Sequence, residues 1–139
     1  MNTPESRTSA ARKPKLPTAI EQAVQAARDK KAMDVQVLDL RPLDSFTDFF
    51  VICSGKNVRQ VQAIADAIED TLRKEHVRPA HIEGFARAEW VLLDYFDFVV
   101  HVFSNERREF FALERLWGSA EQVTLPDEVP HPRAGATRD

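Results

Sequence analysis

Residues 48–60 read DFFVICSGKNVRQ and predict a strand, a tight turn and the start of a helix. The unbroken apolar run from Phe49 to Cys53 is too short for a helix and is typical of a strand covered on both faces. Gly55 follows this run, and we expect it to use the positive φ that other residues avoid. Asn57, with Gln60 three residues later, indicates a capping box at a helix N-terminus. The rest of the chain should pack around this strand–helix unit.

Two of the predicted helices precede and follow this strand. The helix after Asn57 should reach about Lys74, because apolar residues recur there at three- and four-residue steps. An earlier helix should begin in a second capping box, formed by Thr18 with Glu21, and should end near Lys30. Its apolar positions are Ile20, Ala23, Val24 and Ala27.

A third helix is predicted near the end of the folded part. We expect Asn105 to cap it and Gly118 to end it. Its broad apolar face would carry Phe110, Phe111, Leu113, Leu116 and Trp117.

The remaining elements are strands. Residues 35–40 alternate imperfectly, and residues 77–82 contain Pro79, which cannot donate to a ladder and places that strand at a sheet edge. Residues 90–94 and 98–103 form a hairpin around a short turn. The order α-β-β-α-β-β-β-α predicts an α/β fold with a mixed five-strand sheet flanked by helices.

The 139 residues predict one domain, residues 18–123, between two polar tails. We expect residues 1–17 to be a disordered basic tail and residues 124–139 to be disordered as well. No apolar run suggests a membrane span or a secretory signal. The single cysteine, Cys53, reads as a small buried hydrophobe, which suits a reducing cytoplasm.

The charge distribution bears on the partner. The net charge of the chain is −3. Residues 1–17 carry +3 and residues 124–139 carry −1, which leaves a charge of −5 on residues 18–123. An acidic domain is not drawn to phosphates by its overall field. We therefore expect little direct contact with nucleic acid and a basic protein surface as the partner.

The sequence offers no complete catalytic set. The Ser54-Gly55-Lys56 turn could hold an anion at a helix N-terminus, but it lacks P-loop spacing. Asp94 and Asp97 could share a divalent cation, although polar residues in a turn need no such reason. We expect no enzyme activity, no cofactor and no metal. A nucleotide-binding or nucleotidyltransferase-type enzyme stays open as the alternative.

The aromatic residues of the hairpin are more informative. A small sheet has difficulty burying all of them, and exposed Trp and Tyr side chains are favoured anchors in protein contacts. The alternative is that all of them are core. His101 alternates with apolar neighbours, so it is either a half-buried, hydrogen-bonded imidazole or a contact residue. The aromatic residues in question are Trp90, Tyr95, Phe96, Phe98 and Phe103.

Several segments together resemble the ribosomal silencing factor family, also called the Iojap family, from about Thr18 to Val123. The resemblance rests on Asp48-x-Phe50-Val51-Ile52-x-Ser54-Gly55, Arg59-Gln60-Val61-x-Ala63-Ile64-Ala65, Glu83-Gly84, Trp90-x-Leu92-x-Asp94-Tyr95-x-Asp97-x-Val99-Val100-His101-Val102-Phe103, Arg107 to Phe111 and Leu113-Glu114-x-Leu116-Trp117.

The resemblance implies a nucleotidyltransferase-like fold without an established catalytic role. It implies binding to the large ribosomal subunit through ribosomal protein fourteen, on the surface that meets the small subunit. Such binding would block subunit association and repress translation when nutrients are limiting. The resemblance also implies a homodimer.

The residues that would touch the partner are an inference from expected exposure. We expect the contact face to carry Trp90, Leu92 and Asp94 on one hairpin strand and His101 and Phe103 on the other. Asp94 would pair with a Lys or Arg of the partner, and Trp90 would be an apolar anchor. Further candidates are Glu83 and Tyr95.

The hairpin turn departs from the family. The family usually has Gly where Phe96 stands, and Phe does not easily adopt a positive φ. We therefore expect an altered turn.

Overall fold

The computed structural model describes residues 16–107, 121–123 and 125. In chain order, the elements are α1 (Thr18–Asp29), β1 (Met33–Asp39), η1 (Arg41–Leu43), β2 (Phe49–Gly55), α2 (Val58–Lys74), β3 (His81–Glu83), β4 (Trp90–Asp94), β5 (Phe98–Ser104) and β6 (Glu121–Val123).

The strands form one mixed sheet in the order β3-β4-β5-β2-β1-β6. β2 and β5 are parallel, and every other neighbouring pair is antiparallel. The predicted mixed sheet and the hairpin are confirmed. An edge strand is also present in the predicted region, but it spans His81–Glu83 instead of residues 77–82, so Pro79 lies before it. The predicted number of five strands is wrong, because β6 adds a sixth strand that pairs with β1.

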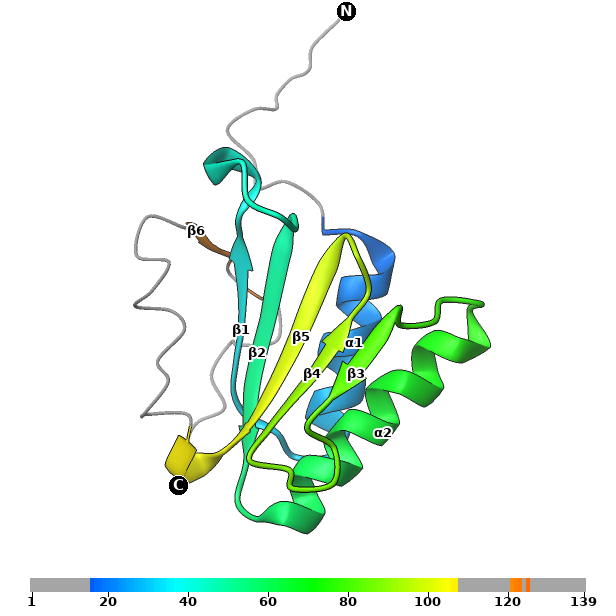
Figure 1. Cartoon of the computed structure of the whole chain (residues 1–139). Coiled ribbons are helices and arrows are strands. Elements are labelled where there is room, and N and C mark those ends of the chain that lie inside the picture. Colours follow the sequence, from blue (N-terminus) through cyan, green and yellow to red (C-terminus); the bar gives the residue numbers. More distant parts are fainter. Residues whose placement is uncertain (1–15, 108–120, 124, 126–139) are drawn as a thin grey trace, which may run out of the picture.

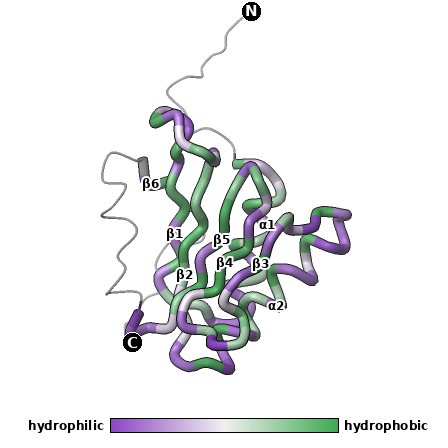
Figure 2. The backbone as a smooth tube through the Cα atoms, in the orientation of Figure 1, coloured by the Kyte–Doolittle hydropathy of each residue, from purple (hydrophilic) through white to green (hydrophobic). Residues whose placement is uncertain are grey.

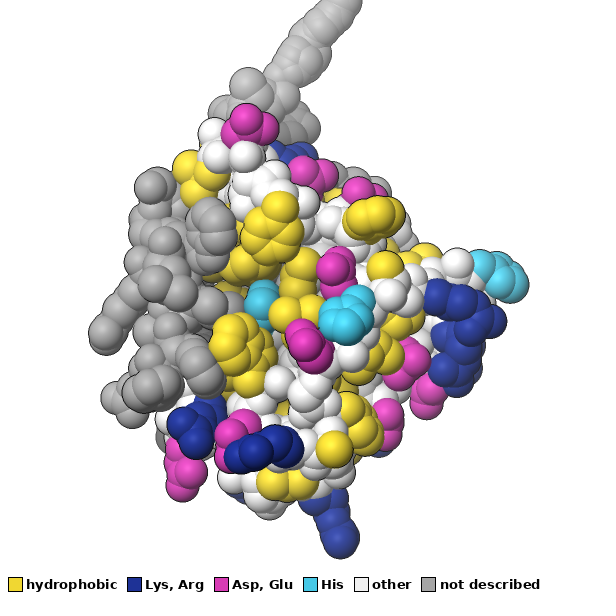
Figure 3. Space-filling model, in the orientation of Figure 1, with side chains coloured by type: hydrophobic (Ala, Val, Ile, Leu, Met, Phe, Trp, Pro, Cys, Tyr) yellow, Lys and Arg dark blue, Asp and Glu magenta, His cyan; other side chains and the backbone are white. Residues whose placement is uncertain are grey.

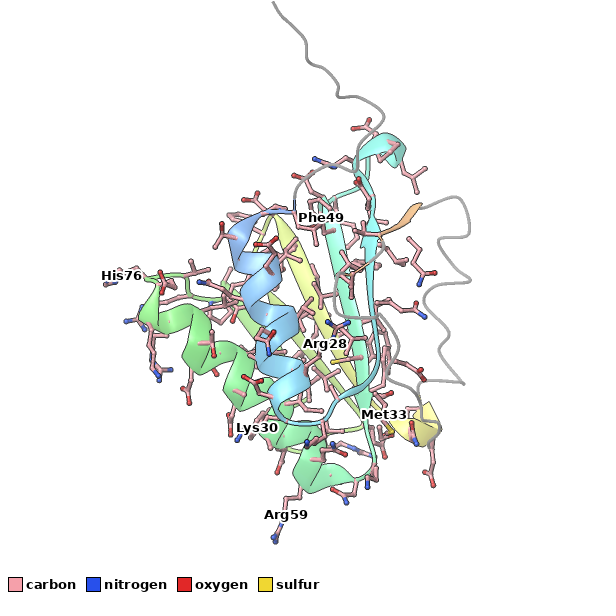
Figure 4. The ribbon with its side chains drawn as sticks, turned by 180° about the vertical axis from the view of Figure 1, so that it is seen from behind. Arg28, Lys30, Met33, Phe49, Arg59 and His76 are labelled. Carbon is pink, nitrogen blue, oxygen red and sulfur yellow. The ribbon has the colours of Figure 1, made fainter. Side chains whose placement is uncertain are left out.

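α1 and α2 lie side by side on one face of the sheet (Figures 1 and 4). The main core fills the space between these helices and the sheet. The opposite face, turned to the viewer in Figure 1, is called the front face here. It carries a second apolar cluster, made of Leu38, Leu40, Phe50, Ile52, Val99 and Phe103.

β2 supplies both clusters, as its continuous apolar run predicts. All seven of its residues are buried. Phe49, Val51 and Cys53 face the helices, whereas Phe50 and Ile52 face the front. Apolar residues are accordingly concentrated in the central strands β2 and β5 in Figure 2.

The expected positive φ of Gly55 is wrong, because Gly84 is the glycine with positive φ in the described part of the chain. Gly55 instead allows a close approach of α2 to the end of β2. A Cβ atom there would lie 3.1 Å from both Cγ2 and the backbone nitrogen of Val61. A close approach of this kind is the other common reason for a glycine at a strand end.

The predicted cap of α2 is confirmed. Asn57 Oδ1 accepts a hydrogen bond from the Gln60 amide at 2.9 Å, and Gln60 Oε1 accepts one from the Lys56 amide at 2.6 Å. Gln60 Nε2 also donates to the carbonyl oxygens of Lys30 and Lys31, both at 3.0 Å. This one side chain therefore ties the start of α2 to the end of α1, where Lys30 is labelled in Figure 4.

Two other predicted caps are wrong. Pro17 occupies the N-cap position of α1 without a side-chain hydrogen bond, so Thr18 is the first helical residue. After β5, residues 105–107 form a helical turn, and Ser104 Oγ rather than Asn105 accepts from the Arg107 amide at 3.3 Å. The remainder of the predicted third helix lies outside the described residues.

The two predicted tails include residues that belong to the core. Leu16 packs against the helix-side core and Leu125 is buried in it. The other residues assigned to the tails lie outside the described part of the chain.

Candidate partner-binding site

The exposed edge of the front face is built by β4 and β3. Trp90, Leu92 and Asp94 are half-buried there, while the intervening Val91 and Leu93 are buried under the helices, as the alternation predicts. β3 pairs antiparallel with β4, so Glu83 lies opposite Leu92. Figure 3 shows hydrophobic side chains near the centre of this face with acidic and His side chains among them.

A shallow groove lies on the front face over the paired strands β3 and β4. It encloses about 180 Å³ and is lined by Glu83, Gly84, Trp90 and Leu92. Gly84 has a φ of 82°, and a Cβ atom at this position would collide with the carbonyl oxygen of Trp90. Only glycine therefore fits between β3 and the start of β4. The role of Gly84 in shaping this groove was not predicted.

His101 and Phe103 lie beneath the contact face rather than on it. Their exposed fractions are 4% and 0%, so neither can touch a partner directly. The ring centroid of Phe103 is 5.1 Å from that of Trp90, and the His101 ring packs edge-on against Phe50 at 4.6 Å. Both residues support Trp90 from the sheet side.

His101 is bonded on one nitrogen only within the described residues. Its Nδ1 accepts a hydrogen bond from Trp90 Nε1 at 3.0 Å, whereas its buried Nε2 has no partner there. Because the indole nitrogen is only a donor, this bond requires a neutral imidazole with its proton on Nε2. Burial lowers the pKa of His101 to about 3, which agrees with the neutral form.

The strand register alone does not reveal this contact. His101 lies opposite Leu92, and Trp90 lies opposite Phe103. The Trp90–His101 bond is therefore a diagonal cross-strand contact, which long aromatic side chains can reach. The sequence signal for this contact was that Trp90 and His101 lie on the same face of two paired strands, two positions apart in register.

Tyr95 lies on the other side of the sheet from the predicted contact face. It is buried with the helix-side core, and its ring stacks on Phe98 at 4.9 Å between centroids. Burial and the nearby charge of Glu69 raise the pKa of Tyr95 to about 12. Its hydroxyl has no hydrogen-bond partner among the described residues. Tyr95 therefore does not belong to the front face with Trp90 and Asp94.

Asp94 has a structural task in addition to its position at the edge. Its Oδ1 accepts a hydrogen bond from the Phe96 amide at 2.9 Å. Phe96 keeps a positive φ of 78°, so the expectation of an altered turn is wrong. Thr47 Oγ1 holds the same turn from outside by donating to the Phe96 carbonyl at 2.8 Å. These two bonds stabilise a conformation that Phe would otherwise avoid.

Two of the chemical readings can be compared with residues 16–107, 121–123 and 125. Those residues contain no group of three or more His, Cys, Asp or Glu side chains that could hold a metal ion. Cys53 is buried in the central strand. None of the helices in this part of the chain combines the length and apolar character needed to cross a membrane.

An α/β domain with an aromatic groove edged by carboxylates has the features of a protein-binding domain. The model of the family described as "Ribosomal silencing factor during starvation" matches residues 13–139. The chain therefore belongs to the ribosomal silencing factor family, as its motifs predicted, and its class of function is regulation of translation in association with the ribosome.

Curated relatives agree with this assignment. The chain is 41% identical over 106 residues to the ribosomal silencing factor of Halalkalibacterium halodurans, covering 76% of this chain and 91% of the relative. It is 43% identical over 103 residues to that of Bacillus subtilis, covering 74% and 87%. A chloroplastic Iojap protein of Arabidopsis thaliana is 36% identical over 113 residues, which cover 81% of this chain and 47% of the relative.

Two solved structures share the fold. A crystal structure of a protein from Bacillus halodurans superposes with a TM-score of 0.70 at 39% identity, covering 78% of this chain and 98% of that one. A crystal structure from Chromobacterium violaceum gives a TM-score of 0.72 at 28% identity, covering 89% and 100%.

Proposed function

We propose that this protein binds the large ribosomal subunit through ribosomal protein fourteen, blocks association with the small subunit and thereby represses translation under nutrient limitation. The observation that carries the proposal is the groove of Trp90 and Leu92 with Glu83 at its rim, in a member of the silencing factor family. Ribosomal proteins are generally basic, and residues 18–123 carry a net charge of −5. The expected encounter is therefore electrostatically favourable.

The mechanism is steric. A folded protein seated on the joining surface of one subunit excludes the other subunit without making or breaking a covalent bond. Neither a cofactor nor a metal enters this mechanism.

The direct contacts proposed are Trp90, Leu92, Asp94 and Glu83, all at the accessible edge of the front face. Asp94 uses Oδ1 for the Phe96 amide, so an arriving Lys or Arg would pair with Oδ2. His101 and Phe103 act from behind, since both are buried.

We also propose a cytoplasmic homodimer with little direct contact to nucleic acid. The acidic charge supports the last point. Light scattering on the purified chain would test the dimer, with a monomeric mass as the contradicting result.

Co-sedimentation with isolated large subunits tests the main proposal. We expect the chain to travel with large subunits and to lower the fraction of joined particles when small subunits are added. A chain that stays at the top of the gradient would contradict the proposal. Turnover of a nucleotide by the purified chain would instead favour the nucleotidyltransferase alternative.

A further inference from the structure

The groove over β3 and β4 has the size of a single side chain. Its volume of about 180 Å³ is below the roughly 300 Å³ at which pockets for small-molecule ligands begin. Among the described residues that line it, Trp90 and Leu92 supply apolar surface, Gly84 supplies backbone, and Glu83 supplies a carboxylate. A long side chain with an apolar stem and a polar end matches such a lining.

The charge at the rim is negative. The side chain of Glu83 is 69% exposed, and its ion-pair partner in the described structure is His81 at 3.6 Å, which is charged only when protonated. Arg87 Nη2 lies 3.6 Å and Arg107 Nη2 lies 3.5 Å from the carboxylate of Glu89. Glu83 therefore offers an exposed carboxylate to an incoming cation.

The indole beside this carboxylate is held in one orientation. The bond from Trp90 Nε1 to His101 Nδ1 and the packing of Phe103 support the ring from the sheet side. A planar guanidinium stacks on an indole and can donate two parallel hydrogen bonds to a carboxylate, whereas an ammonium is a compact, strongly hydrated charge. This arrangement favours arginine over lysine.

We propose that the groove binds an arginine side chain of the protein partner, stacked on Trp90 and paired with Glu83, and that His101 is a positioning residue that holds the indole in place. The proposal rests on the proposed function only for the source of the arginine, a basic ribosomal protein. The chemistry of the groove is independent of that source.

The test uses the full chain labelled with ¹⁵N and two short peptides as probes, acetyl-Gly-Arg-Gly-amide and its counterpart with citrulline, the neutral isostere of arginine. We expect saturable shifts of the Trp90 indole N–H and of the Leu92 and Glu83 amides with the arginine peptide alone. Equal shifts with the citrulline peptide, or no saturable shift at these residues, would overturn the proposal.

Glu83→Gln removes the carboxylate charge without changing the shape of the side chain. We expect the arginine peptide to bind roughly three- to fivefold more weakly, as for an exposed ion pair. The matched control is Asp66→Asn, which removes one charge from the exposed surface of α2 on the helix side. Equal peptide affinities of the two variants would contradict the role of Glu83.

Two variants test the positioning role of His101. His101→Phe removes the acceptor, so the Trp90 indole N–H resonance should move and peptide affinity should fall. His101→Asn places an oxygen near the position of Nδ1 and should restore both. An unchanged indole resonance in His101→Phe would rule out the positioning role. If His101→Phe does not fold, a shifted indole resonance in His101→Asn would rule out the role instead.

The failures of the two proposals are distinguishable. A chain that binds the arginine peptide but not large subunits keeps the groove assignment and loses the proposed function. A chain that sediments with large subunits, yet shows no selective peptide binding, keeps the proposed function and loses the groove assignment.

Discussion

Phe96 has a backbone conformation that suits glycine better. Its φ is 78° and its side chain is 77% exposed, so the ring contributes little burial in return. The left-handed region costs a non-glycine residue roughly 1 kcal/mol. The Asp94 carboxylate and the Thr47 hydroxyl hold the turn closed despite this strain. The turn therefore holds a non-glycine residue in the left-handed region.

Phe96→Gly should raise the free energy of unfolding by roughly 0.5 kcal/mol, because relief of strain exceeds the added entropy of the unfolded chain. Urea denaturation would measure the change. Phe46→Gly is the control, since Phe46 is also exposed but has no positive φ, and this variant should lose stability. A loss of similar size in both variants would show that the turn at Phe96 is unstrained.

His101 gives the stability a pH dependence whose sign follows from its lowered pKa. The unfolded chain takes up a proton on this imidazole below about pH 6.5, whereas the native state does so only near pH 3. Stability should therefore fall as the pH drops from 6.5 towards 3, with a slope of up to about 1.4 kcal/mol per pH unit from this group.

The groups that pack on the imidazole are the aromatic rings of Phe50, Trp90 and Phe103. His101→Phe should remove this part of the slope, as measured by urea denaturation between pH 7 and pH 4.5. His81→Gln, at an exposed site, is the control and should leave the slope nearly unchanged. Parallel stability curves for the native chain and His101→Phe would contradict the assignment of this slope to His101.

At the scale of elements, the β3–β4 connection depends on Gly84. Alanine there needs a positive φ, and its Cβ would collide with the Trp90 carbonyl oxygen, so β3 and β4 must separate. Gly84→Ala should lower the free energy of unfolding by roughly 1–3 kcal/mol. It should also shift the Trp90 indole resonance, because the start of β4 moves. Thermal unfolding and the same NMR signal provide the measurement, and unchanged values for both would contradict this account.

Some of the helices and strands could be predicted from the sequence and others could not. β2, β4, β5 and α2 were predictable because each carries its own apolar run or apolar period and is bounded by turn or cap signals. β6 was not, because three residues of the sequence EQV hold no periodic signal and form a strand only through pairing with β1. Its existence depends on a contact distant in sequence.

The candidate site was likewise predictable only in part. The alternation along β4 correctly placed Trp90, Leu92 and Asp94 on one face. Alternation could not say that β5 lies deeper in the sheet, between β4 and β2, which buries His101 and Phe103. Alternation does assign Tyr95 to the helix side with Val91 and Leu93, where it is buried, so its inclusion among the contact candidates contradicted the pattern of its own strand.

At the scale of the whole molecule, the two faces of the sheet differ in what covers them. α1 and α2 cover one face, while the β3–β4 edge of the other face, which we propose as the contact edge, is accessible (Figures 1 and 3). Core packing between α1 and α2, together with the hydrogen bonds from Gln60 to the end of α1, keeps the two helices in one layer. Substitutions at the contact edge can therefore change binding with little effect on the helix-side core.

Trp90→Ala and Asp94→Lys should both weaken the block of subunit association. Removal of a central aromatic anchor costs about 2 kcal/mol, which corresponds to roughly thirtyfold weaker binding. Asp94→Asn should have a smaller effect, because its amide oxygen can still accept from the Phe96 amide while the charge is lost.

The measurement is the fraction of joined particles in a gradient as each variant is titrated into mixed subunits. Asp66→Lys reverses a charge on α2, away from the contact edge, and should act like the native chain. If Trp90→Ala and Asp94→Lys block joining as well as the native chain does, the contact surface lies elsewhere on the molecule, because an edge that tolerates both losses does not hold the partner.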